Sequence, residues 1–278
     1  MGTPRTPADA AGSTRGENQN VARAARVLDA LADAGSAGLR LIDVVGATGL
    51  TKTVAHRFLG GLVAHGMATV DRTTGRYFLG DRIFAWAVRM GEHFELADRV
   101  APLLRTLAGE LEDTIYFHQR RGDDMICLGR AEGAFPVKTL TLMVGDRRPL
   151  GVGSGSLAIA AHLADAELEA IVARRAPAYA EYSLTPQLLR ADVALTREQG
   201  FALNVDRVIP GMTGVGMPIR SSDGRPVAAI SVVAISPRLA GERRIDVVRR
   251  LGDAVAEVQT DLRGLLDETL GAPFWRAG

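Results

Sequence analysis

Residues 49–65 constrain the fold of this chain more than any other stretch. A helix start is followed there by a segment with one apolar face and one face of short or basic side chains. Thr51 stands at an N-cap position, where its hydroxyl can accept an unpaired backbone N–H. At about 100° per residue, the apolar residues between Val54 and Val63 share one broad face. The opposite arc carries short or basic side chains and no acid: Thr53, His56, Arg57, Gly60 and Ala64. Such an arc is typical of a helix that enters the DNA major groove, although an ordinary surface helix shows the same amphipathic pattern.

The flanking segments favour the DNA-binding interpretation. Apolar residues at helical spacing predict one helix over residues 21–34 and another over about 41–48. With the tight turn at 48–50, these elements give the order helix, turn, helix. Residues 67–70 and 76–79 then alternate like two strands around a turn, which predicts a hairpin. The sequence therefore predicts a winged helix-turn-helix domain over residues 21–80.

The predicted winged domain is locally basic. Residues 20–80 hold seven arginines and lysines against four aspartates, whereas the whole chain has a net charge of +1. This asymmetry fits a DNA-binding module in a chain whose other half does something else. We expect the DNA-contacting residues to be Arg23, Thr51, Lys52, Thr53, His56, Arg57, Arg72 and Arg76. Solvated surface charge is the alternative for the two wing arginines, Arg72 and Arg76.

Composition bounds the class of protein. The chain has 278 residues, 47% of them apolar and 23% charged, which is typical of a globular protein of one or two domains. No apolar run approaches the roughly 20 residues that span a bilayer, and residues 1–20 lack the apolar core of a signal peptide. We expect those 20 residues to form a disordered tail. The single cysteine, Cys127, excludes an internal disulfide, and the protein is predicted to be cytoplasmic.

The rest of the chain predicts a linker helix and an α+β domain. Residues 81–97 carry more apolar side chains than one helix stripe needs, so we expect this linker helix to pack against a second subunit. Burial within its own domain is the alternative. Residues 98–271 then alternate strand and helix patterns. Strands are predicted at 114–120, 125–131, 135–142, 201–206, 213–219 and 226–234, and helices near 100–111 and at 156–163, 165–174, 185–199 and 241–269. This order predicts a sheet with helices packed on it.

Three segments resemble the isocitrate lyase regulator (IclR) family of bacterial transcription regulators: residues 23–31, 48–59 and 74–80. The likeness extends over about residues 21–270. It implies an N-terminal winged helix-turn-helix that binds operator DNA, a GAF-like C-terminal domain that binds a small metabolite, and a homodimer or homotetramer. Repression is expected over activation. The recognition helix departs from the family, which usually has Lys-Ser-Thr where this chain has Lys52-Thr53-Val54.

The resemblance also places an effector pocket in the C-terminal domain. The implied residues are Met143, Gly145, Ser154, Gly155, Asn204, Asp206, Met212, Gly214, Ser231 and Val233. Relatives often carry an acid at the position of Asn204, a cysteine at Gly214 and a second serine at Val233. We therefore expect a roomier, less polar pocket and an effector with an apolar body. The alternative is that these glycines and serines merely make turns.

The sequence has no recognisable catalytic or metal-binding pattern. The glycine-rich stretch 151–156 lacks the P-loop lysine and matches neither the dinucleotide-binding fingerprint nor the nucleophile elbow. The five histidines have no metal-ligand spacing, and His118 is predicted to be a satisfied core or interface residue. We expect no enzyme, no metal and no cofactor. Two rivals remain open: an enzyme with Ser154 or Ser156 as nucleophile, and a DNA-binding protein that responds to no ligand.

Overall fold

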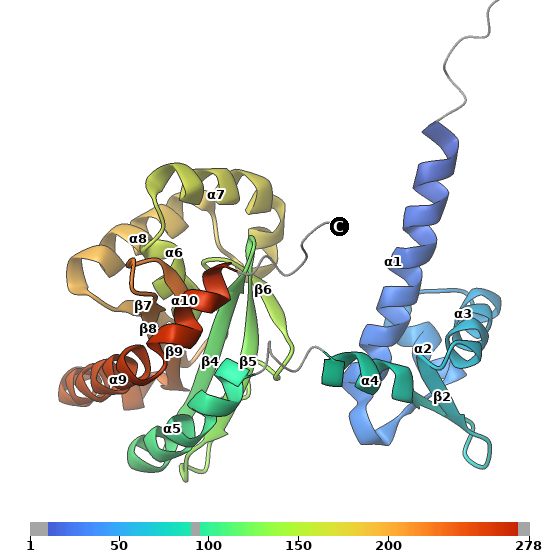
Figure 1. The fold of residues 1–278 in the computed structure, drawn as a ribbon, viewed down its shortest axis with the longest axis horizontal. Helices are drawn as coiled ribbons and strands as arrows, with labels where there is room; N and C mark the ends of the chain where they lie inside the picture. Colours follow the sequence, from blue (N-terminus) through green and yellow to red (C-terminus); the bar gives the residue numbers. More distant parts are fainter. Residues whose placement is uncertain (1–10, 90–94, 272–278) are drawn as a thin grey trace, which may run out of the picture. The chain divides into compact units, whose positions relative to one another are not determined.

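The structure, a computed structural model, describes residues 11–89 and 95–271. The chain forms two compact units, Met1–Glu92 and His93–Gly278 (Figure 1). In neither unit do the described residues include a helix long and apolar enough to cross a membrane. Each unit has its own hydrophobic core and is described by itself below.

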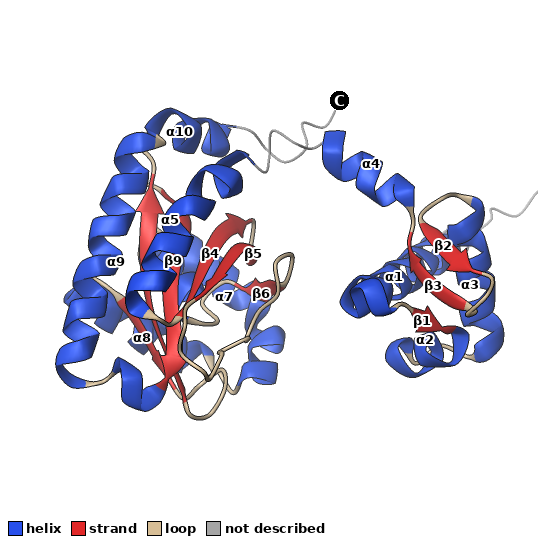
Figure 2. Cartoon of the chain, turned by 90° about the horizontal axis from the view of Figure 1, so that it is seen from below, coloured by secondary structure: helices blue, strands red, loops and turns tan. Residues whose placement is uncertain are grey.

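The first unit is the predicted winged helix-turn-helix. Its helices are α1 (Ala11–Ala34), α2 (Leu41–Thr48), α3 (Lys52–Ala64) and α4 (Asp81–Arg89), and its strands are β1 (Leu39–Arg40), β2 (Ala68–Asp71) and β3 (Arg76–Leu79). The strands form an antiparallel sheet in the order β1-β3-β2, in which the β2–β3 hairpin is the wing (Figure 2). The recognition helix and both hairpin strands lie within one residue of their predicted bounds.

The core of the first unit explains why α2 and α3 meet at a fixed turn. Val27 of α1, Val44 of α2 and Leu59 of α3 are fully buried together. Gly49 ends α2 in the left-handed conformation, with φ 66°, and its N–H donates to the Val45 carbonyl at 3.0 Å. A side chain is strained at that φ, so glycine suits the turn that brings α3 against α1.

The N-terminal boundary differs from the prediction. Residues 11–20 were expected to be part of a disordered tail, but α1 begins at Ala11; residues 1–10 lie outside the described residues. No proline follows Pro7 in this segment, so the backbone N–H groups needed to extend the helix are all present. The predicted linker helix, 81–97, begins at the expected residue, Asp81, as α4. This helix reaches Arg89, and the next helix begins at Glu95. The intervening part of that prediction lies outside the described residues.

The second unit is a six-stranded antiparallel sheet with helices on both faces (Figure 2). Its strands are β4 (Thr114–Arg121), β5 (Asp124–Glu132), β6 (Arg147–Pro149), β7 (Ala202–Val205), β8 (Met212–Arg220) and β9 (Pro226–Ile235), in the order β6-β5-β4-β9-β8-β7. Its helices are α5 (Glu95–Leu111), α6 (Ser154–Ala161), α7 (Asp165–Tyr179), α8 (Pro186–Gln199), α9 (Gly241–Asp261) and α10 (Arg263–Gly271). The α+β class expected from the sequence is confirmed.

Alternation along the central strands assigns the two helix layers. On β4, Ile115 and Phe117 face the core shared with α5, α9 and α10, whereas Tyr116 packs in the core on the side of α6, α7 and α8. On β9, Ile230 and Val232 lie in the first core and Ala229 in the second. Successive side chains of a strand point to opposite faces, so strands buried on both sides contribute to both cores.

Two secondary-structure predictions for this unit are wrong. Residues 135–142 were expected to be a strand, but they form an irregular segment. Pro136 cannot donate to a sheet, and the segment is held by side-chain bonds instead: the Thr139 hydroxyl donates to the Val233 carbonyl at 2.7 Å, and the Tyr116 hydroxyl donates to the Thr139 carbonyl. The predicted helix 241–269 ends at Asp261, and α10 begins at Arg263.

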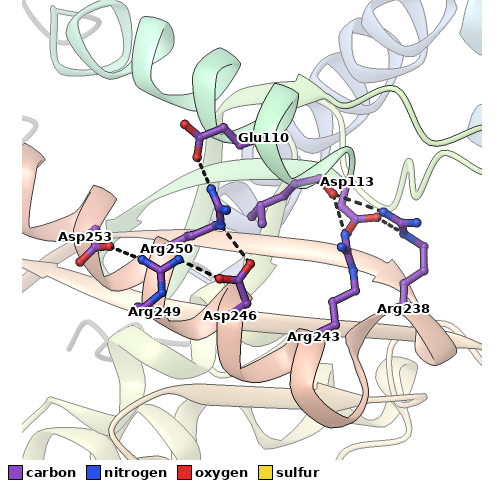
Figure 3. A network of polar contacts seen from close by, with 9 residues as sticks. Glu110, Asp113, Arg238, Arg243, Asp246, Arg249, Arg250 and Asp253 are labelled. Atoms are coloured by element: carbon purple, nitrogen blue, oxygen red, sulfur yellow. Dashed lines mark hydrogen bonds and ion pairs between the residues drawn. The ribbon is translucent and has the colours of Figure 1, made fainter.

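An ionic network around the buried Asp113 carboxylate anchors the start of β4 (Figure 3). The Asp113 side chain is 2% exposed and pairs with Arg238 Nε and Arg243 Nη2, each at 2.7 Å. Arg238 also lies over the ring of Phe135, 3.8 Å from its centroid. About two turns further along α9, Arg250 pairs with Glu110 of α5 at 2.9 Å. These contacts hold α5, α9 and the first residue before β4 in one position, which fixes the strand that lines the cavity described next.

Candidate functional site

The outer face of α3 is exposed, as the sequence predicts. Ala55, Leu59 and Leu62 are buried in the core of the first unit. The side chains on the other side are exposed: Thr51, Lys52, Thr53, His56 and Arg57. Thr51 is the N-cap, and its Oγ1 accepts the Val54 N–H at 3.4 Å, which confirms the predicted helix start. Contact of these residues with DNA stays a prediction.

The wing is shaped by one aspartate and one arginine. Asp71 accepts hydrogen bonds from the Thr73 N–H at 2.8 Å and the Thr74 hydroxyl at 2.7 Å, which lower the pKa of its carboxyl group. This turn leaves Arg72 exposed beside the tip. Arg76 is engaged differently: its Nη1 donates to the carbonyls of Ala37 at 3.1 Å and Gly38 at 2.9 Å. Arg76 therefore ties β3 to the corner after α1, and Arg72 is the freer of the two wing arginines.

The remaining predicted DNA-contacting residue, Arg23, lies half-buried on α1. Arg23 belongs to a different element from the predicted DNA-contacting residues of α3 and the wing. Within the described residues, no hydrogen bond or ion pair joins its side chain to theirs. Among the predicted DNA-contacting residues, the exposed basic ones lie on α3 and at the wing tip.

The second unit contains a cavity between the N-terminus of α6 and the adjacent face of the sheet. Its empty volume is about 450 Å³, a figure that includes the open mouth. Seven of the ten predicted effector residues line it: Ser154, Gly155, Asn204, Met212, Gly214, Ser231 and Val233. These seven residues thus lie around one cavity, and effector binding by them stays a prediction.

Three predicted effector residues lie outside the cavity lining. Met143 is 57% exposed. Gly145 lies in a turn, and its N–H donates to the Cys127 carbonyl at 2.8 Å. Asp206 has φ 54°, and its Oδ1 accepts the Gly211 N–H at 2.9 Å and the Ser236 hydroxyl at 2.7 Å. These three residues belong to the loops around the cavity and are not among its lining residues, and their contact with an effector stays a prediction.

Twelve lining residues were missed: Tyr116, His118, Met125, Thr141, Leu142, Arg148, Val152, Gly153, Ser156, Val208, Ile209 and Thr213. For Tyr116 and His118 the signal was partial: strand alternation places both on one face of β4, but it does not show that this face borders a cavity. For Arg148 no signal existed, because β6 has only three residues and its register follows from pairing with β5.

His118 provides the central polar group of the cavity. It is 3% exposed, and its Nε2 lies 2.8 Å from the Ser231 Oγ. Its Nδ1 is buried and has no hydrogen-bond partner among the described residues. Burial, helped by the positive charge of Arg148, lowers the pKa of His118 to about 3, so the ring is neutral near pH 7. The prediction that this histidine is buried is confirmed, but the prediction that it is satisfied is wrong.

Glycines bring α6 onto the sheet at this point. A Cβ on Gly155 would overlap the His118 ring, and a Cβ on Gly214 would come within 2.5 Å of the Ser154 Oγ. Gly214 was expected to leave room for a ligand. Instead, the Ser154 side chain occupies the space beside it, so this glycine serves the close approach of α6 to β8.

The serines of the cavity do not form a complete nucleophile arrangement in the described residues. Ser156 Oγ accepts the Gly151 N–H at 2.8 Å and serves the loop before α6. Ser231 does face a histidine, but no carboxylate orients the Nδ1 of that ring, and the low pKa of His118 makes it a weak base. Burial raises the pKa of Cys127 to about 11, which disfavours its thiolate. The described residues contain no group of three or more candidate metal ligands.

Comparison with known proteins gives one consistent result. The model of the IclR helix-turn-helix domain matches residues 20–72, and that of the bacterial transcriptional regulator IclR C-terminal domain matches residues 89–260. The chain is 28% identical to the HTH-type transcriptional regulator BhcR of Paracoccus denitrificans, over 86% of this chain and 84% of the relative. It is 22% identical to the transcriptional repressor IclR of Escherichia coli, over 94% of this chain and 96% of the repressor.

A solved structure adds a bound ligand to this comparison. An IclR homolog from Microbacterium hydrocarbonoxydans, crystallised in complex with 4-hydroxybenzoate, is 25% identical to this chain. Its TM-score is 0.68, and the alignment covers 88% of this chain and 99% of that one. The two-domain architecture described above is therefore shared along nearly the whole length of a solved relative.

Proposed function

Because the chain belongs to the IclR family of bacterial transcriptional regulators, we propose that its cavity binds a small organic effector that alters operator binding by the first unit. The observation that carries this proposal is the cavity at the N-terminus of α6, which has apolar walls and a buried, half-satisfied histidine. A buried polar atom without a partner costs free energy, and a ligand that supplies the partner recovers it.

For the operator, we propose that α3 enters the major groove. Lys52 and Thr53 lie at its N-terminal end, and Arg57 lies one turn further along the same exposed side. Arg57 is assigned a base or phosphate contact, and Arg72 a phosphate or minor-groove contact from the wing. Arg76 is proposed to act indirectly, since its guanidinium already holds the wing to the corner after α1.

We propose that the protein binds DNA as a dimer or a pair of dimers. One winged unit reads too few base pairs for genomic specificity, so two units on a pseudo-palindrome are needed. Helix α4 supports this proposal: Phe84 is 71% exposed and Val88, one turn later, is 60% exposed. Two large apolar side chains on one helix face are a surface suited to a second copy of the chain.

Repression with release by the effector is the regulatory scheme we propose, by analogy with the E. coli relative named a repressor. An effector can change operator affinity only by binding the DNA-bound and DNA-free states with different affinity. A regulator of chromosomal promoters acts where the chromosome lies, so the protein is assigned to the cytoplasm.

A joint binding screen tests this function. Operator binding is measured by fluorescence anisotropy on the full-length protein with DNA from its own promoter, and organic compounds are scored for thermal stabilisation and for DNA release. We expect a pseudo-palindromic footprint, a steep loss of affinity with salt, and at least one compound active in both assays. Specific DNA binding that no compound alters would favour a ligand-independent regulator. Turnover of a bound compound would favour an enzyme.

A further inference from the structure

We propose that the second unit has a separate anion site, in which Arg220 and Arg263 hold the phosphoryl group of inorganic phosphate or of a small phosphate ester. The site is a hollow beside the turn between β8 and β9. It goes beyond the proposed function, because it depends neither on the effector cavity nor on operator binding.

The hollow lies where the β8–β9 turn meets the end of α9 and the start of α10. Its empty volume is about 560 Å³, a figure that includes the open mouth. The lining residues are Arg220, Ser221, Ser222 and Gly224 of the hairpin, and Gln259 and Arg263 of the two helices. None of these six residues carries a carboxylate or a large apolar side chain. A hollow whose charged groups all have one sign attracts a polar ligand of the opposite sign.

Two hydrogen bonds hold the walls of the hollow together. The backbone N–H of Arg220 donates to Gln259 Oε1 at 2.8 Å, which ties the hairpin to α9. The backbone N–H of Ser222 donates to Asp267 Oδ1 at 2.8 Å, which ties the turn to α10. The hollow is therefore formed before a ligand binds, and a preformed site loses little conformational entropy on binding.

The two arginines of the hollow lack counter-ions. In the described residues, no carboxylate lies within ion-pair distance of Arg220 or Arg263, although the nearby Arg225 pairs with Asp223 at 2.6 Å. The Asp223 carboxylate is thus engaged on the turn itself, and the Asp267 carboxylate accepts the Ser222 N–H. Two guanidinium groups in one hollow raise the local positive potential, and an anion between them lowers it.

The neighbouring polar side chains add hydrogen-bond donors. The Gln259 oxygen accepts the Arg220 N–H, so the NH₂ group of this amide remains to donate. The Ser222 side chain is exposed on the turn, and its hydroxyl can donate as well. A phosphoryl group suits such a set, because it has three strong acceptor oxygens and a charge near −2, which two arginines balance.

Acidic residues around the hollow favour a small ligand. Asp223 and Asp267 flank the turn, and Asp261 is exposed at the end of α9. An extended polyanion such as the DNA backbone would meet these carboxylates and be repelled by them. A single phosphoryl group needs to contact only the lining donors.

His162 is a natural reporter of the charge in this hollow. It directly follows α6, and its Nδ1 lies 2.8 Å from the Ala158 carbonyl oxygen. Burial lowers the pKa of His162, the bond to Ala158 opposes this effect, and the positive charges of Arg220 and Arg197 lower the pKa further. An anion bound to Arg220 offsets part of that charge, so the pKa of His162 should rise when the hollow is filled.

Titration of the full-length protein with small phosphates tests the proposal. Inorganic phosphate, methyl phosphate and methyl sulfate are titrated by calorimetry at about pH 8, where both phosphates are dianions, and at about 150 mM chloride, which screens non-specific attraction. We expect saturable binding of at least one phosphate, about tenfold or more tighter than methyl sulfate, a monoanion. Arg220→Met and Arg263→Met should each weaken this binding about tenfold or more. Arg105→Met should leave it unchanged, because Arg105 is an exposed arginine of α5 outside the hollow.

The two phosphates also distinguish the source of the ligand. Tighter binding of methyl phosphate than of inorganic phosphate would support an ester, and the reverse order would support free phosphate. The proposal is overturned if neither phosphate binds, or if binding survives in both Arg220→Met and Arg263→Met. It is also overturned if saturating phosphate leaves the pKa of His162, followed by NMR of its ring, unchanged in the wild-type protein.

The His162 measurement needs no variant, so it decides the location even if an arginine variant fails to fold. Loss of operator binding in Arg220→Met and Arg263→Met, without phosphate binding by the wild type, would assign these arginines to DNA and refute the small-ligand site. A protein that binds phosphate in this hollow but releases operator DNA with no compound would keep this site and lose the proposed effector function.

Discussion

The pH dependence of stability tests the state of His118 directly. In an unfolded chain a histidine has a pKa near 6.5, whereas burial lowers the pKa of His118 to about 3 in the folded protein. Between these values the unfolded chain binds one more proton than the folded chain. Acid therefore favours unfolding, so the contribution of neutral His118 is present above pH 7 and is lost as the pH falls from about 6.5 toward 3.

The magnitude follows from the same two values. Each pH unit below the unfolded pKa removes about 1.4 kcal/mol, so the free energy of unfolding should fall by about 1.4 kcal/mol between pH 7.5 and pH 5.5 through this residue alone. For a domain of about 150–250 residues, that loss corresponds to a decrease of roughly 3–6 °C in Tm. The perturbation is His118→Gln, which keeps a hydrogen-bonding side chain beside Ser231 but does not titrate.

The assay is denaturation of the full-length, ligand-free protein by urea, followed by circular dichroism at both pH values. The difference between wild type and His118→Gln isolates His118 from the other titrating groups, including His162, whose pKa burial also lowers. His65→Gln is the control, because His65 is exposed on the first unit. If wild type and His118→Gln lose equal stability on acidification, His118 is not held neutral, and the description of the cavity as desolvated at this point is wrong.

Three further predictions concern the two surfaces. Arg57→Ala should weaken specific operator binding by about 1–3 kcal/mol without changing the melting temperature, because Arg57 is exposed; unchanged affinity in an anisotropy titration would place the recognition surface elsewhere. Ser231→Ala should weaken the effector response by about 1 kcal/mol or more, because it leaves His118 with no hydrogen bond; a normal dose–response curve for DNA release would argue against this pocket assignment. Gly155→Ala should lower the melting temperature by the equivalent of about 1–3 kcal/mol and reduce effector binding, because its methyl group overlaps the His118 ring; a variant with normal melting and binding would show that α6 can move away.

The sequence by itself determined the first unit almost completely. Its signals are local: the N-cap at Thr51, the helical spacing of apolar residues in α1 to α3, and the alternation on each side of the wing turn. The structure places the recognition helix at Lys52–Ala64 and the wing strands within a residue of their expected ends. Short elements joined by short turns have few alternative arrangements, so periodicity is sufficient to define them.

The boundaries that the sequence missed have specific causes. Pro136 and the bonds made by Thr139 and Tyr116 turn an alternating stretch into an irregular segment, although its pattern resembles a strand. The start of α1 was placed too late, because composition suggested disorder where nothing prevents a helix from extending. In both cases a local pattern was outweighed by contacts or backbone chemistry outside the pattern.

The cavity shows most clearly what only the tertiary structure decided. Its polar groups include residues of β4, β6, α6 and β9, which are far apart in the sequence and meet because β4 pairs with both β5 and β9. Strand β4 is buried on both faces, so its sequence does not reveal that His118 faces a cavity. The placement of Arg148 depends on a three-residue strand whose register is set by β5. A one-residue shift of that register would turn the Arg148 side chain away from the cavity.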